Sequence, residues 1–383
     1  MKPAKNSCKV GHRAAGLTGL GRREIELLSS PSTSRARAAE ILSSPQVMSE
    51  IFRERLSWLF PKGAVLASCR PKVLMKRLGS RQVVSYRLLF SGNEKPLTLV
   101  LKRYADKTQG EKTYSAMRIL WENGFDRKSR FRIPEPLSYL QDLGLLVLEK
   151  AVGRQLSEIF GQGGPVVIAR MRTVGRWLAK LHSLDIDLGG ISPHPEEETS
   201  AKDYVLMAKE KGYRSAEEME SLTVLALSRL SAFKDVQAVP VHGDFQCPNI
   251  FAGRDSITVI DFDRFCRSDP ARDLGYMIAQ TRAMGFWTGV SKRAVYSGLK
   301  AFEEAYLAEA PQREGDTLSA RASLFAAIKC LQNIFYLLLY MPPGGSMAEE
   351  DMERLSVLLD EAEHFCKLED VEEALKVPVA SGH

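Results

Sequence analysis

The feature that most constrains the fold is a change of pattern near Gly153. Before it, residues 64–104 contain four short apolar or β-branched runs separated by turn residues, a pattern typical of consecutive antiparallel hairpins. After it, apolar residues recur every three or four positions, as in Ile168, Met171 and Val174, which predicts amphipathic helices. We therefore expect an α+β chain with two lobes, a small antiparallel β-rich lobe followed by a larger, mainly helical lobe. A length of 383 residues suits two such lobes of roughly 150 residues each.

The expected boundaries follow from the same patterns. Residues 1–45 are serine- and proline-rich without a strand signal, so we predict a disordered basic extension. Residues 46–150 should form the N-terminal lobe, with a hinge at 149–153, and residues 151–375 the C-terminal lobe. The predicted local elements are helices at Gln46–Phe60, Gln109–Asn123 and Val166–Leu184, strands at 64–70, 72–78, 83–90 and 97–104, and a hairpin turn near Gln141–Gly144.

Composition excludes several classes of protein. With 44% hydrophobic and 26% charged residues, the chain is neither collagen-like, nor a disulfide scaffold, nor wholly disordered. Its six cysteines are scattered without a CxxC pair, which indicates reduced thiols and a cytoplasmic location. The most apolar run, Ile334–Met341, is far shorter than the roughly 20 residues of a membrane-spanning helix, so we expect no span. A basic, serine-rich, acid-poor start also fits an organelle transit peptide, and this alternative stays open.

The positive charge is concentrated at one end. The net charge is +6, and residues 1–40 contain eight Lys or Arg and three Glu. The remainder is close to neutral, so it gives no case for a nucleic-acid surface. The basic segment 1–45 alone leaves open a tether to nucleic acid or to an anionic membrane.

The segment with the clearest chemistry is VHGDFQCPNIF (241–251), followed by TVIDFD (258–263). Asp244 and Asn249 lie five positions apart in a loop, and Asp261 and Asp263 end a short strand. Together they form an oxygen-rich set, which suits Mg²⁺ bound together with phosphate groups. In phosphoryl transfer, one carboxylate accepts the proton of the attacking hydroxyl, while an amide and a second carboxylate hold the metal.

These roles can be assigned by position. We expect Asp244 to be the catalytic base, Asn249 and Asp261 to be the metal ligands, and Asp263 to be a further or indirect ligand. His242 is expected to hold the loop by hydrogen bonds rather than to transfer a proton. The alternative is that Asp244, Asn249 and Asp261 are ordinary turn residues without a catalytic or metal-binding role.

The order HGDxxxxN, IDFD and DPARDLG (269–275), together with WLAKLHSL (177–184), resembles the aminoglycoside phosphotransferase and choline kinase-like family. The resemblance covers about residues 65–340 and implies a protein-kinase-like fold that uses ATP or GTP with Mg²⁺. Asp269, Arg272 and Asp273 are expected to cap a helix and brace the catalytic loop.

The same resemblance implies nucleotide-binding residues in the first lobe. Lys102 ends the strand LTLVLK, where the family's phosphate-binding lysine is expected, and Glu111 resembles its glutamate partner. Gly79 and Ser80 lie where a turn covers the phosphates, and the backbone from Glu149 to Ala151 would meet the adenine. As alternatives, Lys102 is a solvated strand residue, Glu111 a helix first-turn acid and Ser80 an ordinary turn residue.

The acceptor is less defined. Family members often have histidine after HGD, whereas this loop reads Phe245-Gln246-Cys247-Pro248, which puts the substrate in doubt more than the chemistry. Cys247 is either a reactive thiol or, as we expect, a packing residue. Acidic runs at 196–198 and 217–220 would suit an aminoglycoside, but such runs are usually solvated faces.

We therefore predict a phosphotransferase that moves the γ-phosphate of ATP or GTP to a hydroxyl of a small molecule. Aminoglycosides, sugars, amino alcohols and related metabolites are all open as acceptors, and the oligomeric state is not predicted. The alternatives are a catalytically silent nucleotide-binding scaffold and a protein kinase. No activation-loop pattern follows IDFD, which disfavours the protein kinase.

Overall fold

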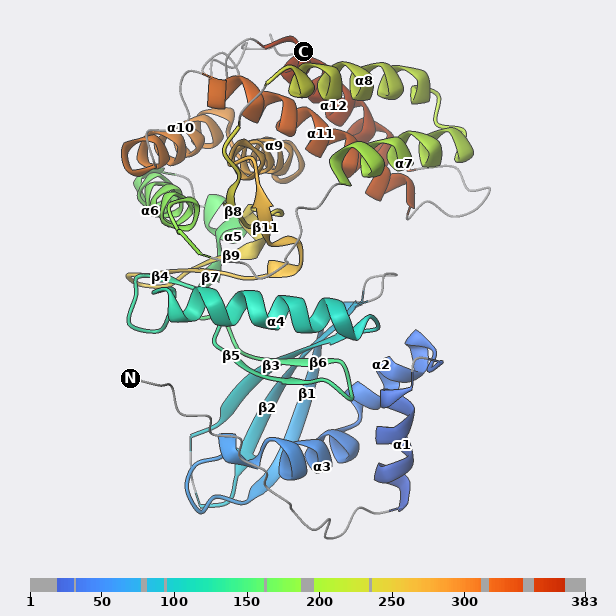
Figure 1. The fold of residues 1–383 in the computed structure, drawn as a ribbon, viewed down its shortest axis with the longest axis vertical. Coiled ribbons are helices and arrows are strands. Elements are labelled where there is room, and N and C mark those ends of the chain that lie inside the picture. Colours follow the sequence, from blue (N-terminus) through green and yellow to red (C-terminus); the bar gives the residue numbers. More distant parts are fainter. Residues whose placement is uncertain are drawn as a thin grey trace. The chain divides into compact units, whose positions relative to one another are not determined.

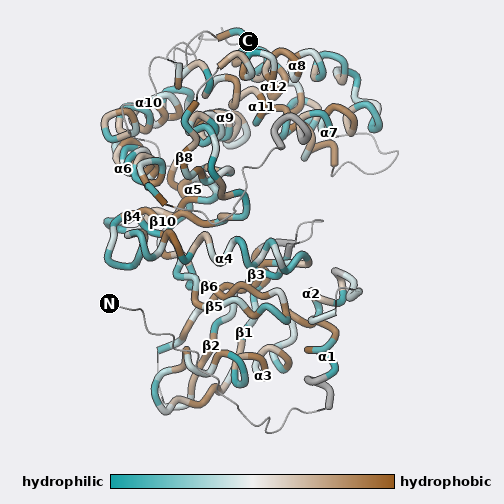
Figure 2. Tube along the Cα trace, viewed as in Figure 1, coloured by the Kyte–Doolittle hydropathy of each residue, from teal (hydrophilic) through white to brown (hydrophobic). Residues whose placement is uncertain are grey.

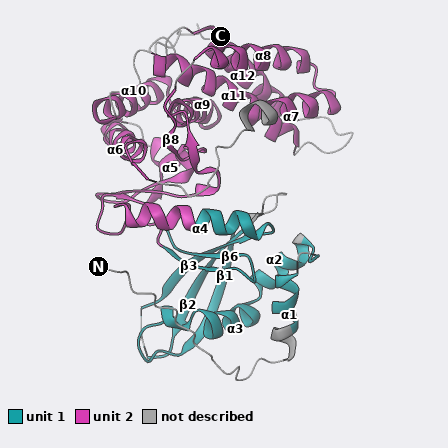
Figure 3. Ribbon diagram, viewed as in Figure 1, with its two compact units in different colours: residues 1–114, 136–150 teal, residues 115–135, 151–383 magenta. Residues whose placement is uncertain are grey.

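The computed structural model describes residues 19–30, 32–76, 81–92, 95–161, 164–186, 196–233, 236–310, 317–339 and 348–368. The chain divides into two compact units (Figure 3). Unit 1 comprises residues 1–114 and 136–150, and unit 2 comprises residues 115–135 and 151–383. The second boundary, between Lys150 and Ala151, falls inside the predicted hinge. Residues 115–135 were expected in the first lobe and instead group with unit 2.

Unit 1 is built on a five-stranded antiparallel sheet in the order β1-β2-β3-β6-β5 (Figure 1). Its strands are β1 (Leu66–Lys76), β2 (Arg81–Phe90), β3 (Leu97–Tyr104), β5 (Pro136–Leu140) and β6 (Leu145–Glu149). The turn between β5 and β6 coincides with the hairpin turn expected at Gln141–Gly144. Helix α4 (Lys107–Glu122) matches the helix predicted over Gln109–Asn123 within two residues and is divided between the units (Figure 3).

The two strands predicted at 64–70 and 72–78 are one continuous strand, β1. Pro71 does not break it and lies opposite Tyr86 of β2. Because β1 is at the edge of the sheet, a residue without a backbone N–H is tolerated there. The prediction of a break at Pro71 was therefore wrong.

The expected disorder of residues 1–45 is also wrong where the structure describes them. Helices α1 (Gly19–Ser29) and α2 (Arg35–Ser43) precede α3 (Pro45–Arg55) and the short 3₁₀ helix η1 (Ser57–Leu59). The serines taken as signs of disorder are helix caps. The Ser34 hydroxyl accepts from the Arg37 N–H (3.3 Å), and Ser44 caps α3 ahead of Pro45 at its first turn. Residues 1–18 lie outside the described part.

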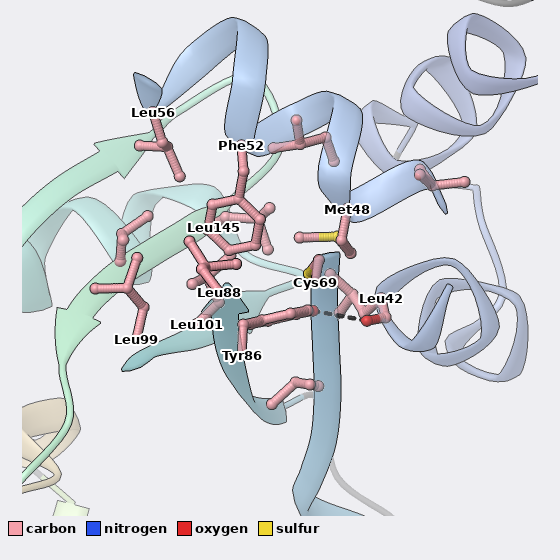
Figure 4. Close-up of a cluster of buried hydrophobic side chains, with 14 of the residues drawn as sticks. Leu42, Met48, Phe52, Leu56, Cys69, Tyr86, Leu88, Leu99, Leu101 and Leu145 are labelled. Atoms are coloured by element: carbon pink, nitrogen blue, oxygen red, sulfur yellow. Dashed lines mark hydrogen bonds between the residues drawn. The ribbon is translucent and has the colours of Figure 1, made fainter. Parts of the chain in front are cut away.

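These helices bury their apolar faces in the core of unit 1 (Figure 4). Leu42, Met48 and Phe52 pack with strand residues such as Leu88, and all four are at most 1% exposed. The Tyr86 ring lies edge-on to Phe52, and its hydroxyl donates to the Leu42 carbonyl (2.7 Å). Each such apolar side chain contributes about 1.5–3 kcal/mol on burial, so α2 and α3 are integral to the unit.

Unit 2 is mainly helical, as predicted. Its helices are α5 (Leu156–Phe160), α6 (Gly164–His182), α7 (Glu196–Glu210), α8 (Ala216–Ala232), α9 (Ala271–Thr288), α10 (Lys292–Glu309), α11 (Leu318–Leu339) and α12 (Glu349–Lys367). Helix α11 packs against α7, α8, α9 and α12, so it is the central helix of the unit. It is rich in apolar residues (Figure 2).

Among the described helices, α11 alone has the length and composition of a membrane span. However, 78% of its most apolar window is buried inside the protein. A buried core helix meets the same criteria, so this composition does not establish a span.

Unit 2 also contains short strands, which are joined by turns and loops. The four-stranded sheet has the order β4-β10-β9-β7, and β11 pairs with β8. These strands are β4 (Phe131–Arg132), β7 (Arg154–Gln155), β8 (Val239–Val241), β9 (Ile250–Ala252), β10 (Ile257–Val259) and β11 (Cys266–Ser268). They are linked by the 3₁₀ helices η2 (Cys247–Asn249) and η3 (Phe262–Arg264).

Candidate active site

The loop after β8 contains Asp244 and is fixed by close backbone packing. Gly243 has φ +77°, and a Cβ added there would lie 2.3 Å from the Arg264 carbonyl oxygen. Both the left-handed backbone and the contact require glycine. The loop is therefore held directly against the end of η3.

Asp244 is surrounded by hydrogen-bond donors. Its Oδ1 accepts from Lys329 Nζ (2.9 Å), and its Oδ2 accepts from Gln246 Nε2 (2.8 Å). Asn249 Nδ2 donates to the Asp244 carbonyl (3.0 Å) and to Oδ2 (3.3 Å). The Asp244 side chain stays 23% exposed, whereas Lys329 is 3% exposed. The carboxylate is thus fixed by its hydrogen-bond donors and remains partly accessible to solvent.

The electrostatics of the site keep Asp244 ionised. Burial favours the neutral acid, but the charges of Lys329 and Arg264 and the hydrogen bond from Lys329 outweigh it. The pKa of the Asp244 carboxyl is therefore held well below its ordinary value of 3.8.

Lys329 is the site residue that the sequence did not reveal. It lies on α11, and its Nζ also donates to Gln332 Oε1 (2.7 Å), whose Nε2 donates to the Tyr204 hydroxyl of α7 (2.7 Å). Its ammonium also lies 4.7 Å from the centroid of the Tyr276 ring. The available signal was the group Lys329, Gln332 and Asn333 in the apolar second half of α11, since polar residues at such positions need buried partners.

His242 has the predicted structural role. The Asp244 N–H donates to His242 Nδ1 (3.2 Å), so Nδ1 is the acceptor and Nε2 donates to the Ile260 carbonyl (2.9 Å). These bonds occupy both ring nitrogens and tie the loop to the end of β10.

Asp273 braces the loop that contains Asp244, as the sequence predicted. Its carboxylate accepts from the backbone N–H groups of His242 (2.7 Å) and Gly243 (2.8 Å) and lies 3.2 Å from His182 Nε2. Burial raises the pKa of Asp273, but hydrogen bonds and charge from His182 and His242 lower it below 3.8. A completely buried carboxylate thus fixes the backbone ahead of Asp244.

Asp269 and Arg272 belong to the same brace. Asp269 Oδ1 accepts from the Ala271 N–H (2.9 Å) at the start of α9, and Oδ2 accepts from Arg321 of α11 (2.8 Å). Arg272 is buried, with its guanidinium over the Tyr276 ring and its Nη1 3.8 Å from Cys266 Sγ.

The predicted metal ligands lie on neighbouring strand ends. The Ile260 N–H donates to the Asn249 carbonyl (2.9 Å), which places Asn249 beside Asp261. Asp261 has φ +72°, the only positive φ among the described non-glycine residues, so its backbone is strained. Asp263 is 5% exposed. The described residues contain no cluster of three His, Cys, Asp or Glu side chains arranged as a metal site.

Cys247 is a packing residue. It is 1% exposed, and its thiol lies 3.3 Å from the Thr281 hydroxyl. Burial raises the pKa of the Cys247 thiol to about 12, so it is not a nucleophile at neutral pH.

The predicted nucleotide-binding residues lie in or beside unit 1. Lys102 is 8% exposed on β3, with its ammonium 5.5 Å from the centroid of the Tyr104 ring, so it is not a solvated strand residue. Glu111 is exposed, and its carboxylate accepts from Gln141 Nε2 (3.3 Å), a partner other than the predicted Lys102. Glu149 ends β6, with Ala151 just beyond the unit boundary. Gly79 and Ser80 lie outside the described residues.

The fold and this loop define a kinase-like phosphotransferase, and the sequence comparison agrees. A model of the phosphotransferase enzyme family matches residues 84–337, which is more than half of the chain. The chain therefore belongs to this family and is a kinase whose acceptor is an alcohol group of a small molecule. Among the curated proteins compared, no sequence matches the chain.

Solved structures of small-molecule kinases share the fold. The Plasmodium vivax ethanolamine kinase Pv091845 is 15% identical, with a TM-score of 0.53 over 86% of this chain and 93% of its own. Choline kinase LicA from Streptococcus pneumoniae is 13% identical, with a TM-score of 0.54 over 83% of this chain and 99% of its own. Amicoumacin kinase hAmiN, solved with AMP-PNP and Ca²⁺, is 15% identical, with a TM-score of 0.52 over 83% and 96%. At these identities the likeness extends to the fold alone, which is the predicted two-lobed kinase-like α+β architecture.

Proposed function

We propose that this protein transfers the γ-phosphate of ATP or GTP to a hydroxyl of a small molecule, with Asp244 as the group that receives the hydroxyl proton. The observation that carries the proposal is the Asp244 carboxylate, fixed by Lys329, Gln246 and Asn249 and still partly exposed. A carboxylate in this arrangement can accept a hydrogen bond from an entering hydroxyl and fix its direction of attack.

The low pKa of Asp244 decides how it works. A carboxylate this acidic is a weak base, so it orients the hydroxyl first and takes the proton only as the new P–O bond forms. This order suits phosphoryl transfer, in which the transition state is loose and positioning supplies most of the catalysis.

Asn249 and Asp261 fit the requirements of a Mg²⁺ site. The Asn249 amide directs its nitrogen to Asp244, which leaves its oxygen on the opposite side, and Asp261 adds a carboxylate at the adjoining strand end. One amide and one carboxylate oxygen, with phosphates and water, complete a typical Mg²⁺ coordination shell. When bound there, the ion supplies positive charge to the phosphates of the nucleotide. We include Asp263 as an indirect ligand.

For unit 1, we propose that Lys102 binds the nucleotide phosphates and that the backbone from Glu149 to Ala151 binds the base. Lys102 is buried on a central strand, where a fixed ammonium is suited to this task. We make no such proposal for Glu111, because its exposed carboxylate has Gln141 as partner.

The test is Mg²⁺-dependent consumption of ATP and GTP with a panel of hydroxylated small molecules. Asp244→Asn should lower kcat about 10²–10⁴-fold and leave nucleotide affinity nearly unchanged. Asp255→Asn, which removes an exposed carboxylate of the same unit, is the matched control and should behave as wild type. Wild-type turnover by the Asp244 variant would refute the base assignment. Nucleotide binding without turnover for any acceptor would favour the silent scaffold.

A further inference from the structure

The charge around Asp244 differs from that of a site for a cationic acceptor. The two ionic groups that lower the pKa of Asp244 most are Lys329 and Arg264. Lys329 is already paired with Asp244, and Arg264 brings a second positive charge close to the same carboxylate.

Arg264 is held in place by the backbone. It is the last residue of η3, and its carbonyl and Cβ would lie 2.3 Å and 2.9 Å from a Cβ on Gly243. Since Gly243 immediately precedes Asp244, the Arg264 side chain starts beside the catalytic loop. Its position is therefore set by the same packing that sets Asp244.

Three other arginines of unit 2 have bonded partners within the chain. Arg282 forms an ion pair with Glu361 (2.7 Å), Arg321 forms one with Asp269 (2.8 Å), and Arg267 donates to the Ala238 carbonyl (2.7 Å). Within the described residues, the half-buried guanidinium of Arg264 has no hydrogen bond and no ion pair. Its charge is stabilised by nearby groups without a direct bond, so the N–H donors of this guanidinium are available to an anion from outside the chain.

The groups near Arg264 are suited to the same ligand. Burial lowers the pKa of Arg264, while the phenols of Tyr276, Tyr336 and Tyr204 and the Asp244 carboxylate raise it. The tyrosines supply neutral hydroxyls close to the cation. The acidic run at 217–220 is not assigned to acceptor binding. Glu217 and Glu218 are exposed on α8, and Glu220 pairs with Lys209.

We propose that the acceptor carries an acidic group, a carboxylate or a phosphate, near the hydroxyl that is phosphorylated, and that Arg264 binds this group. The inference rests on the proposed function of Asp244. The planar guanidinium matches the two oxygens of a carboxylate or phosphate and would fix the hydroxyl relative to Asp244. An acceptor with a net positive charge would instead meet Arg264 as a like charge.

The same guanidinium chemistry also suits the γ-phosphate of the nucleotide, so the experiment must separate the two sources. Steady-state kinetics should compare hydroxy acids with their primary amides (glycerate with glyceramide, gluconate with gluconamide), together with glycerol 2-phosphate, glycerol, ethanolamine and choline. The proteins are the wild type, Arg264→Met and Arg264→Lys. Arg267→Met is the control, since that half-buried arginine has carbonyl partners of its own.

The wild type should prefer an acidic acceptor to its neutral counterpart at least about tenfold in kcat/KM. Arg264→Met should lower kcat/KM for the acid about 10- to 100-fold, because a charge-assisted hydrogen bond is lost. It should leave the neutral acceptor and the nucleotide KM nearly unchanged. Arg264→Lys should recover part of the preference, and Arg267→Met should keep it.

Three results would overturn the proposal. One is a wild-type preference for neutral or cationic acceptors. Another is an equal loss for all acceptors with a raised nucleotide KM in Arg264→Met, which would assign Arg264 to the γ-phosphate. The third is the absence of acid-specific binding to the wild type by calorimetry with AMP-PNP and Mg²⁺, which counts against the proposal even without turnover. Failure of the base assignment is seen separately, as an unchanged rate in Asp244→Asn.

Discussion

In unit 1 the core cluster is apolar, with the Tyr86 hydroxyl bonded to the Leu42 carbonyl at its centre. In unit 2 the interior contains ionic pairs: Lys329 with Asp244, Arg321 with Asp269, and Arg282 with Glu361. Apolar contacts tolerate small shifts, whereas buried ion pairs are costly unless their geometry is kept. The comparison indicates that burial of apolar side chains stabilises the sheet of unit 1. In unit 2, buried ion pairs fix atoms at a site, at the cost of desolvating the charged groups. Perturbed pKa values gather at such sites.

The strongest test of this comparison is Lys329→Met. It leaves Asp244 without its closest cation, and breaking a buried pair in this way should lower the free energy of unfolding by about 3–5 kcal/mol. Thermal or urea unfolding measures this loss. Lys300→Met, which removes an exposed lysine of α10, should cost less than about 1 kcal/mol. Equal losses in the two variants would show that the buried pair contributes no more to the free energy of unfolding than an exposed lysine does.

The same variant changes the dependence on pH. In the wild type the pKa of Asp244 lies below 3.8, so the stability gained from its ionised form is present above pH 3.8 and is lost as the pH falls below that value. Without Lys329, the pKa of Asp244 in the folded protein rises toward its ordinary value, so the loss of stability on acidification becomes smaller. The acid limb of kcat/KM should move upward with it, and an unmoved limb would contradict the electrostatic role of Lys329.

A smaller effect is expected in unit 1 from Phe52→Ala. Phe52 is fully buried, and its removal leaves a cavity beside Tyr86, so the free energy of unfolding should fall by about 3 kcal/mol. The acid limb of kcat/KM should not move, because no ionisable partner of Asp244 is touched. Trp58→Ala, at a 61% exposed position of the same unit, serves as the control and should change little.

The smallest effect is expected from Tyr86→Phe. The change removes the 2.7 Å hydrogen bond to Leu42 and leaves a buried carbonyl without this donor, at a cost of about 1 kcal/mol. Urea unfolding would detect this difference. A loss as large as that of Lys329→Met would mean that neutral and ionic buried groups contribute equally to the free energy of unfolding. The proposed difference between the two units would then be wrong.

Much of the fold was accessible from the sequence because it depends on local periodicity. The hairpin turn at Gln141–Gly144, helix α4 and the helical unit 2 follow from side-chain spacing and turn residues. The N-terminal helices were missed because Ser34 and Ser44 have the composition of a disordered segment and the position of helix caps. Only the packing of Leu42 and its neighbours on the sheet distinguishes the two cases.

By itself, the sequence determined the chemical groups of the candidate site and their order along the chain: Asp244, Asn249, Asp261 and the brace at Asp273. Short spacing fixes these groups because neighbouring residues share one loop and its backbone hydrogen bonds. Only the tertiary structure decided that Lys329, 85 residues away, neutralises Asp244. It also decided that Arg264 has no hydrogen bond or ion pair within the described residues. The physical reason is that such pairings arise when helices pack, and a helix pattern specifies which face is buried but not which charge it will meet.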